Sequence, residues 1–307
     1  MKDNYKILIP GGTGFLGYHL CLFFVKKKWK VFSISKSKPK KNKKIKGVKY
    51  IYCDVSDKKN LKKKLDNYYD YVVNLSGYVD HSKNNSITKT HFQGCKNLIY
   101  NFKKKRPKKF IQIGSSIEYG KLESPQKEIF LKKIDTFSKY GNAKLASTFF
   151  LLSIFKENSY PISIIRPYLV YGPNQDNNRV IPFVINNSLE GNIFNCSSGS
   201  QLRDFLYIED FVKAVYKSLK STKNNGEVIN IGSGKPVKIK SLILKIKNLI
   251  GKGRPKFSKI QIRSDEPVKL YPDILKAKKL LNWRPKITLE QGLKKTINFY
   301  KKNVQKS

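Results

Sequence analysis

The chain contains a serine, a tyrosine and a lysine whose types and spacing suit proton transfer at a carbonyl or an alcohol. Tyr140 and Lys144 are four residues apart in Ser-Lys-Tyr-Gly-Asn-Ala-Lys, so in a helix they lie one turn apart on the same face. A lysine ammonium beside the phenol favours the phenolate, which allows Tyr140 to act as a general acid or base near neutral pH. Ser115, in Ile-Gly-Ser-Ser, is expected to hydrogen-bond the reacting oxygen. We therefore predict that Ser115, Tyr140 and Lys144 are catalytic.

A glycine-rich segment, Gly-Gly-Thr-Gly-Phe-Leu-Gly at 11–17, follows a short apolar strand and precedes an apolar helix. Gly11 permits a tight turn, Gly14 a close approach of a pyrophosphate, and Gly17 close packing of the helix on the strand. The N-terminus of the helix supplies amide donors for phosphates. A plain glycine turn is the alternative, but the flanking strand and helix favour a dinucleotide loop. The predicted cofactor contacts here are Gly11, Gly14, Phe15, Leu16 and Gly17.

The residues that follow the next strands indicate which dinucleotide binds. An acidic residue at the end of the second strand favours the ribose hydroxyls of NAD, whereas this chain has Ser35 and Lys36 there. Hydroxyl and ammonium donors favour NADP(H), with NAD(H) as the alternative. Tyr140 and Lys144 are expected to contact the cofactor as well. Further predicted cofactor-binding residues follow the third and fourth strands, namely Asp54, Val55, Leu75, Ser76 and Gly77.

These motifs belong to an alternating pattern of strands and helices over the first half of the chain. Strands are predicted at 5–10, 30–35, 50–53, 71–75, 110–113 and 162–165, and helices at 15–28, around 61–65, at 88–104 and at 137–157. Such alternation predicts a parallel sheet with right-handed crossovers, in which ligands bind at the carboxyl ends of the strands. The sequence therefore predicts an α/β fold with a Rossmann-type doubly wound parallel sheet.

The pattern changes after Pro173, where proline, asparagine and glycine become frequent. Helical segments are predicted near 179–189, 209–219 and 238–250, with a strand at 228–231. We predict a dinucleotide-binding domain over 1–173 and a smaller, partly interleaved C-terminal lobe over 174–307. The lobe is expected mainly to bind substrate, and some of its segments are expected to return to the first domain.

Length and composition set limits on the class of protein. The 307 residues are 39% hydrophobic, which is enough for one large domain with a smaller one. No apolar run has the length of a membrane-spanning helix, so we expect no membrane insertion. The four cysteines are widely spaced and form no Cys-x-x-Cys pair. We therefore expect a reduced, cytoplasmic protein with no metal site.

The formal net charge of +42, from 63 Lys and Arg against 21 Asp and Glu, is unusual for an enzyme. A nucleic acid or an anionic membrane is one partner that such a charge would attract. The lysines, however, fall in many separate clusters, and Asn and Ile are abundant throughout, as biased codon usage would produce. We therefore predict no specific nucleic-acid site, although the charge would still attract an anionic substrate.

Taken together, these motifs resemble the extended short-chain dehydrogenase/reductases, specifically the NAD-dependent epimerase/dehydratase family that modifies nucleotide sugars. The resemblance covers nearly the whole chain. Besides the two motifs above, it includes Ser-Ser-Ile-Glu-Tyr-Gly at 115–120, Arg-Pro-Tyr-Leu-Val-Tyr-Gly-Pro at 166–173, Arg-Asp-Phe-Leu-Tyr-Ile-Glu-Asp at 203–210, and the pair at 273–277 and 281–285.

The resemblance implies a nucleotide-sugar substrate and several of its contacts. Arg203 and Arg263 stand where the family contacts the substrate diphosphate, and a guanidinium suits phosphate oxygens. Ser116 and Arg179 are further predicted substrate-binding residues. Family resemblance also implies a homodimer that forms through the helices near 88–104 and 137–157.

One departure from the family bears on the reaction. The 4,6-dehydratases of the family have an acidic pair directly after the catalytic Ser or Thr, whereas this chain has Ser116 and Ile117. Glu118 is one position too late, and in a strand its side chain would turn to the other face. We therefore do not expect the chain to eliminate water from a nucleotide hexose.

The favoured function is an NAD(P)-dependent oxidoreductase that reduces a nucleotide-linked 4-keto-6-deoxyhexose, as in polysaccharide biosynthesis. Gly-Ser-Ser-Ile-Glu-Tyr-Gly at 114–120 and the segment at 74–81 resemble reductases of the CDP-abequose synthase kind. A 4-epimerase that retains NAD is the first alternative. A non-catalytic RNA-binding relative is the second, but such a protein would not need the Ser-Tyr-Lys set.

Overall fold

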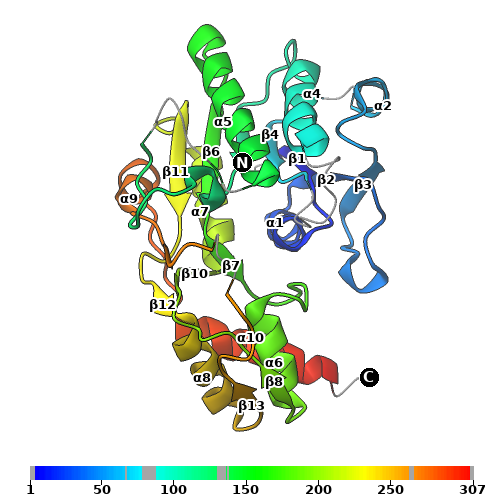
Figure 1. Cartoon of the computed structure of the whole chain (residues 1–307). Helices are drawn as coiled ribbons and strands as arrows, with labels where there is room; N and C mark the ends of the chain where they lie inside the picture. The colour runs from blue at the N-terminus through cyan, green and yellow to red at the C-terminus, as the bar shows by residue number, and fades with distance from the viewer. Residues whose placement is uncertain are drawn as a thin grey trace.

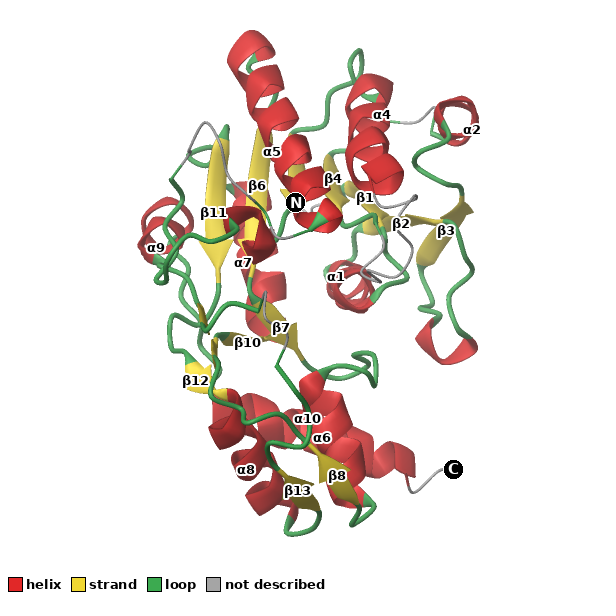
Figure 2. Cartoon of the chain, viewed as in Figure 1, coloured by secondary structure: helices red, strands yellow, loops and turns green. Residues whose placement is uncertain are grey.

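The computed structural model of the chain describes residues 4–65, 68–77, 88–129, 136, 138–262 and 266–304. It comprises a large parallel sheet covered by helices, which lies above a smaller lobe built mainly of helices (Figure 1). Figure 2 shows the strands of the main sheet side by side in the upper part of the molecule, with helices in front of and behind them.

The main sheet has seven strands, and every neighbouring pair in it is parallel. Their order is β11-β6-β5-β4-β1-β2-β3. The strands are β1 (Lys6–Pro10), β2 (Lys30–Ser35), β3 (Val48–Tyr52), β4 (Tyr71–Asn74), β5 (Lys109–Ile113), β6 (Ile162–Pro167) and β11 (Glu227–Ile231). The chain moves outward from β1 through β2 to β3, then returns to place β4 on the other side of β1. That reversal forms the crevice in which doubly wound sheets bind ligands, and the predicted fold class is confirmed.

Helices cover both faces of this sheet, because side chains alternate along each strand. Ile7 and Ile9 of β1 belong to the core that includes α1 (Phe15–Lys26) and α7 (Ile208–Lys220). Leu8 belongs to the opposite core, with α2 (Lys58–Lys64), α4 (Gly94–Asn101) and α5 (Lys139–Asn158). The helix predicted at 88–104 instead begins with a π-helical turn, η2 (Lys89–Gln93), and α4 ends at Asn101.

In the smaller lobe, the helices α6 (Val180–Leu189), α8 (Ile239–Ile250) and α10 (Leu289–Val304) pack together, whereas α9 (Leu275–Leu281) lies beside β11 of the main sheet (Figure 1). Short strands join these helices. They are β7 (Leu169–Tyr171) with β10 (Phe205–Tyr207), β8 (Ile193–Asn195) with β13 (Arg254–Lys256), and β9 (Leu202–Arg203) between β12 (Val237–Lys238) and β14 (Lys269–Leu270).

The two parts of the molecule interleave as the sequence predicts. The strand predicted at 228–231 belongs to the main sheet as β11, where it pairs with β6. The preceding helix, α7, packs against that sheet as well. The chain therefore leaves the main sheet after β6 and comes back to it before completing the lobe, while the domain boundary at 173 stays a prediction.

Within the described ranges, no helix combines the length and the hydrophobicity needed to cross a membrane.

Candidate active site

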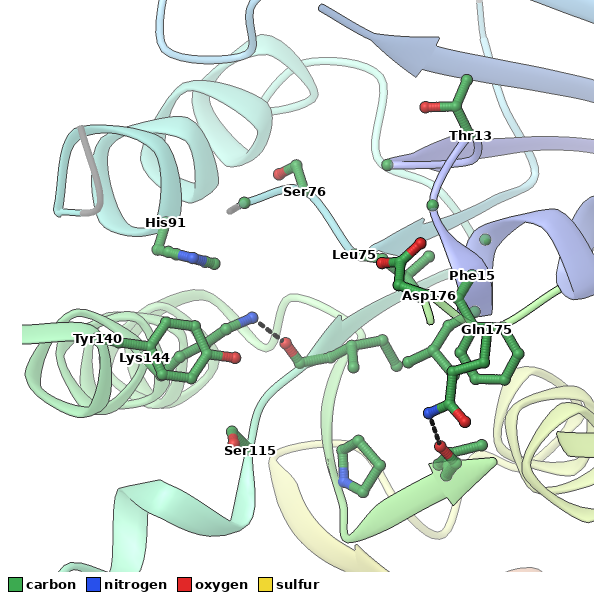
Figure 3. Close-up of a pocket in the computed structure, with 18 of the residues that line it drawn as sticks. Thr13, Phe15, Leu75, Ser76, His91, Ser115, Tyr140, Lys144, Gln175 and Asp176 are labelled. Atoms are coloured by element: carbon green, nitrogen blue, oxygen red, sulfur yellow. Dashed lines mark hydrogen bonds between the residues drawn. The ribbon is translucent and has the colours of Figure 1, made fainter. Parts of the chain in front are cut away.

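A cavity of about 910 Å³ lies at the carboxyl ends of the sheet strands. It runs from the glycine-rich loop, past Ser115, Tyr140 and Lys144, to the start of the smaller lobe at Arg179. Figure 3 shows the labelled side chains of this cavity, with Tyr140, Lys144 and Ser115 at one end and Thr13 and Phe15 at the other. Most of the residues that the sequence predicts to be functional therefore line the same cavity.

Two positions of the glycine-rich loop, Gly11 and Gly17, have no room for a side chain. Gly11 has a φ of +82°, and a Cβ there would lie 2.8 Å from the Leu75 carbonyl. A Cβ at Gly17 would lie 2.2 Å from the Gly11 oxygen, so only glycine lets α1 approach the loop. Gly14 is the N-cap of α1, and a Cβ there would lie 3.4 Å from the Gly11 oxygen. A bare backbone at a helix N-terminus fits a dinucleotide pyrophosphate.

The end of the cavity beside β2 and β3 carries the residues predicted to hold the adenosine. Ser35, Lys36, Asp54 and Val55 all line it. Thr13 Oγ1 donates to Ser35 Oγ at 3.1 Å, and Lys36 Nζ lies 3.5 Å from Asp54 Oδ2. Burial raises the pKa of Asp54, but hydrogen bonds from Ser56 and the charge of Lys36 outweigh it, and the pKa falls below its ordinary value. The Asp54 carboxylate is therefore hydrogen-bonded to Ser56 and paired with Lys36.

Leu75, Ser76 and Gly77 line the cavity directly after β4. Asn74 Oδ1 accepts from Ser76 N at 3.0 Å and from Ser76 Oγ at 2.6 Å, which fixes the turn. Gly77 has a φ of +134°, and its missing side chain makes room for the His91 ring. The second half of the predicted 74–81 motif lies outside the described residues.

Tyr140 and Lys144 lie in the first turns of α5, whose N-cap Ser138 accepts from Gly141 N at 3.1 Å. Lys144 is buried, and its Nζ donates to the Ile113 carbonyl at 2.7 Å. Ile113 ends β5 and stands two residues before Ser115. One hydrogen bond thus connects the helix that carries Tyr140 with the strand that carries Ser115.

The pKa of Tyr140 differs from the expectation. Removal of the phenol from water raises the pKa of Tyr140 to about 12, although a hydrogen bond with Ser115 lowers it. Burial lowers the pKa of Lys144 to about 8. Lys144 is not among the causes of this shift, since its ammonium donates to the Ile113 carbonyl, and the effect of Lys144 on the Tyr140 phenolate stays a prediction. The phenol is protonated at neutral pH.

The segment after Ser115 also differs from the expectation. It forms a 3-10 turn, η3 (Ser116–Tyr119), rather than a strand. Glu118 Oε1 accepts from Ser115 N at 2.7 Å, and Ser115 Oγ accepts from Ile117 N at 3.4 Å, which is a capping box. Glu118 does turn away from the cavity, but the turn and not strand alternation is the reason.

The predicted substrate-binding residues occupy different places. Arg179 lines the cavity at the start of α6, and its charge lowers the pKa of Tyr140. Arg203 is buried beside the cavity, where its Nη2 donates to Glu266 Oε1 at 2.6 Å. Ser116 is buried in η3 and is not among the lining residues. Arg263 lies outside the described residues.

Two residues at the cavity are not among those predicted from the sequence. The buried His91 ring packs edge-on against Tyr140, with ring centroids 5.0 Å apart. Glu266 lines the cavity and binds Arg203. Both contacts join segments that are far apart along the chain, although the closeness of Glu266 to Arg263 is a signal that could have been used.

A protein-family model and several known proteins are similar to this chain over most of its length. The model of the "NAD dependent epimerase/dehydratase family" matches residues 7–232. A UDP-glucuronate 4-epimerase of Thermodesulfobacterium geofontis is 29% identical, over 97% of both chains. A UDP-N-acetyl-alpha-D-glucosaminuronate decarboxylase of Bacillus cytotoxicus is 28% identical, over 96% of this chain and 98% of that protein. The structure of UDP-glucuronic acid 4-epimerase from Bacillus cereus, in complex with UDP-glucuronic acid and NAD, is 28% identical, covers 97% of this chain and 99% of its own, and has a TM-score of 0.85.

Proposed function

The chain belongs to the NAD-dependent epimerase/dehydratase family, and on that premise we propose that it is a nucleotide-sugar 4-ketoreductase. The observation that carries the proposal is the single cavity that joins the glycine-rich loop to Ser115, Tyr140 and Lys144. Relatives in the comparison act on nucleotide sugars, which supports such a substrate here. The nicotinamide, when bound, supplies or takes up the hydride.

The protein's own groups are suited to protonating a carbonyl oxygen. Tyr140 holds its proton at neutral pH, because burial raises the pKa of its hydroxyl to about 12. It can therefore act as the general acid in a reduction. Ser115, hydrogen-bonded to Tyr140, is placed to donate to the same oxygen and stabilise its developing charge. Lys144 holds α5 in place through Ile113.

Elimination of water is disfavoured by the residues after Ser115. Ser116 and Ile117 carry no carboxyl group, and the Glu118 carboxylate is buried with all its contacts inside the protein. A buried carboxylate that accepts several hydrogen bonds has no access to a substrate proton. The geometry therefore supports hydride and proton transfer at one carbon without elimination.

A 4-epimerase is the second candidate, and the relatives favour it. Both the Thermodesulfobacterium protein and the Bacillus cereus structure are 4-epimerases, and the latter contains NAD. An epimerase uses one group first to take up the hydroxyl proton and then to return it, and it keeps its cofactor, whereas a ketoreductase consumes cofactor. The two reactions therefore differ in whether cofactor is consumed, and the Ser-Tyr-Lys set does not distinguish them.

Purified protein should therefore be incubated with UDP-, dTDP-, CDP- and GDP-linked sugars and their 4-keto-6-deoxy forms. A ketoreductase consumes one NAD(P)H for each 4-keto sugar, and an epimerase interconverts two sugars with no net consumption. Tyr140→Phe should lose most turnover while binding cofactor normally, and Ser115→Ala should lose about 10²- to 10³-fold. The matched control Tyr52→Phe alters an exposed tyrosine of β3 and should be fully active. Near-normal turnover by Tyr140→Phe would refute the mechanism.

We propose that the cofactor is NADP(H). Ser35, Lys36 and Ser37 line the adenosine end of the cavity, and Asp54 is engaged by Lys36 and Ser56. Donors at the end of β2 suit a 2′-phosphate, and a carboxylate there would repel it.

Titration of the protein with NADPH and NADH tests this assignment. NADPH should bind more tightly, and Ser35→Asp should weaken NADPH binding by about tenfold or more, the effect of ~1.4 kcal/mol, with little effect on NADH. Ser35→Asn is the uncharged control and should keep the preference. Equal affinity of the wild type for both cofactors would contradict the assignment.

We also propose a homodimer through α4 and α5, which lie side by side on one face of the sheet (Figure 1). The described part of this face exposes Tyr100 and Phe149, and Phe92 and Phe150 pack beside them. Exposed aromatic side chains of this kind are typical of an interface core.

Light scattering after size exclusion should give twice the monomer mass for the wild type. Replacing both Tyr100 and Phe149 by Glu should give a monomer, because two charges would be buried in the interface. Leu275→Glu, at a more exposed apolar position on α9, is the control and should leave the dimer intact. A monomeric wild type would overturn the proposal.

We propose that Arg203 and Arg263 contact the diphosphate of the substrate, and that Arg179, which lines the cavity, also binds the substrate. The cytoplasmic location, the part in polysaccharide biosynthesis and the absence of a specific nucleic-acid partner stay predictions.

A further inference from the structure

Glu118 lies outside the cavity, yet its carboxylate connects three of the elements that build the active site. The side chain is fully buried. Its Oε1 accepts from the Ser115 amide at 2.7 Å. Its Oε2 accepts from Thr148 Oγ1 at 2.6 Å and from the Arg166 guanidinium, with Nη2 at 2.7 Å and Nε at 3.0 Å. Ser115 directly precedes η3, Thr148 belongs to α5 and Arg166 belongs to β6.

Each of these contacts acts close to a proposed catalytic group. Ser115 is itself one of them, and the amide that Glu118 binds belongs to it. Thr148 follows Lys144 by four residues and Tyr140 by eight, so all three lie on the same side of α5. The carboxylate therefore connects the two halves of the Ser-Tyr-Lys set directly, in parallel with the hydrogen bond from Lys144 to Ile113.

The surrounding structure is shaped to admit this carboxylate. A Cβ at Gly114 would lie 2.4 Å from Glu118 Oε1 and 3.2 Å from Arg166 Cγ, so a side chain at 114 would displace the ion pair. The Arg166 guanidinium lies 4.4 Å from the centroid of the Tyr119 ring, and Tyr119 Oη donates to Asn230 Oδ1 of β11 at 2.7 Å. The carboxylate is thus held by groups that are themselves fixed to the sheet.

Stability alone does not explain such an arrangement. A buried ion pair often contributes little net stability, because the cost of removing two charges from water offsets their attraction. Its geometry, however, is strict, since each donor must meet the carboxylate at hydrogen-bond distance. We propose that Glu118 is a positioning residue that sets the placement of Ser115 relative to Tyr140 and Lys144 on α5. This inference rests on the proposed function for its kinetic part only.

The charge of Glu118 also reaches two titratable groups of α5, Tyr140 and Lys144. Burial is the main cause of the raised pKa of Tyr140 and of the lowered pKa of Lys144, and in both groups Glu118 pushes the pKa upward. Among the described residues, the other ionisable groups near Tyr140 include Lys144 on the same helix, His91 of η2 and Arg179 at the start of α6. Removing the Glu118 charge must therefore lower the pKa of Tyr140, so that its proton is lost at a lower pH.

Glu118→Gln keeps the size of the side chain and removes its charge, and it is the variant that tests the proposal. We expect kcat to fall by about 10²-fold, the scale of a misplaced catalytic group, with KM and cofactor affinity changed less than about twofold. The loss of reductive activity at high pH should move to lower pH. Glu118→Asp should restore part of kcat and the wild-type pH dependence. The control Glu290→Gln removes the same charge from an exposed ion pair and should change none of these quantities.

A double variant separates positioning from the cost of an unpaired arginine. Glu118→Gln with Arg166→Met removes both charges, and its thermal unfolding temperature should return towards that of the wild type while kcat stays low. Full recovery of kcat in the double variant would overturn the proposal, because the loss would then come from the unpaired Arg166 alone.

An ultraviolet titration makes the test independent of any substrate. The difference between each protein and its Tyr140→Phe counterpart reports the ionisation of Tyr140, and Glu118→Gln should shift that ionisation to lower pH. If the wild type turns over no nucleotide sugar, the proposed function fails, and the titration still decides the role of Glu118. Unchanged ionisation of Tyr140 in Glu118→Gln would contradict the inference.

Discussion

The hydrogen bond from Lys144 Nζ to the Ile113 carbonyl is the interaction on which the proposed active site depends most. A buried ammonium without a partner is costly, so Lys144 constrains α5 to one position against the end of β5. Tyr140 then lies one turn before this contact, and Ser115 two residues after Ile113. This hydrogen bond between helix and strand thereby places the proposed proton donor, Tyr140, beside Ser115, the hydroxyl proposed to bind the reacting oxygen.

The other parts of the cavity meet along the same edge of the main sheet. Parallel strands bring their carboxyl ends to one side, so segments from β1, β2, β4 and β5 meet there although they are far apart in sequence. Gly11 and Gly17 let α1 come close to the turn after β1, and the space left open continues past Tyr140 to Arg179. The smaller lobe is tied to this edge by hydrogen bonds from His19 and Lys43 to the carbonyls of Pro173 and Asn174. The glycine-rich loop, Tyr140 and the start of the smaller lobe therefore line one cavity.

Much of this could be predicted from the sequence, because the decisive signals are local. Glycine spacing, the Tyr140–Lys144 pair and the apolar strands are short patterns with direct structural meaning. The tertiary environment was harder to predict: the raised pKa of Tyr140 follows from burial by distant segments, and His91 meets Tyr140 from a segment about 50 positions away. The turn after Ser115 was an avoidable error, since a Ser followed three residues later by a Glu is a capping box.

We propose that this site transfers hydride at C4 of a nucleotide-linked sugar while Tyr140 supplies the proton. The decisive experiment incubates purified protein with a nucleotide-linked 4-keto-6-deoxyhexose and NADPH that carries deuterium in both C4 positions of the dihydronicotinamide, and examines the product by NMR and mass spectrometry. The wild type should form a sugar with one deuterium at C4, and Tyr140→Phe should not. A sugar product without deuterium at that carbon, or with deuterium at another, would refute the proposed hydride transfer.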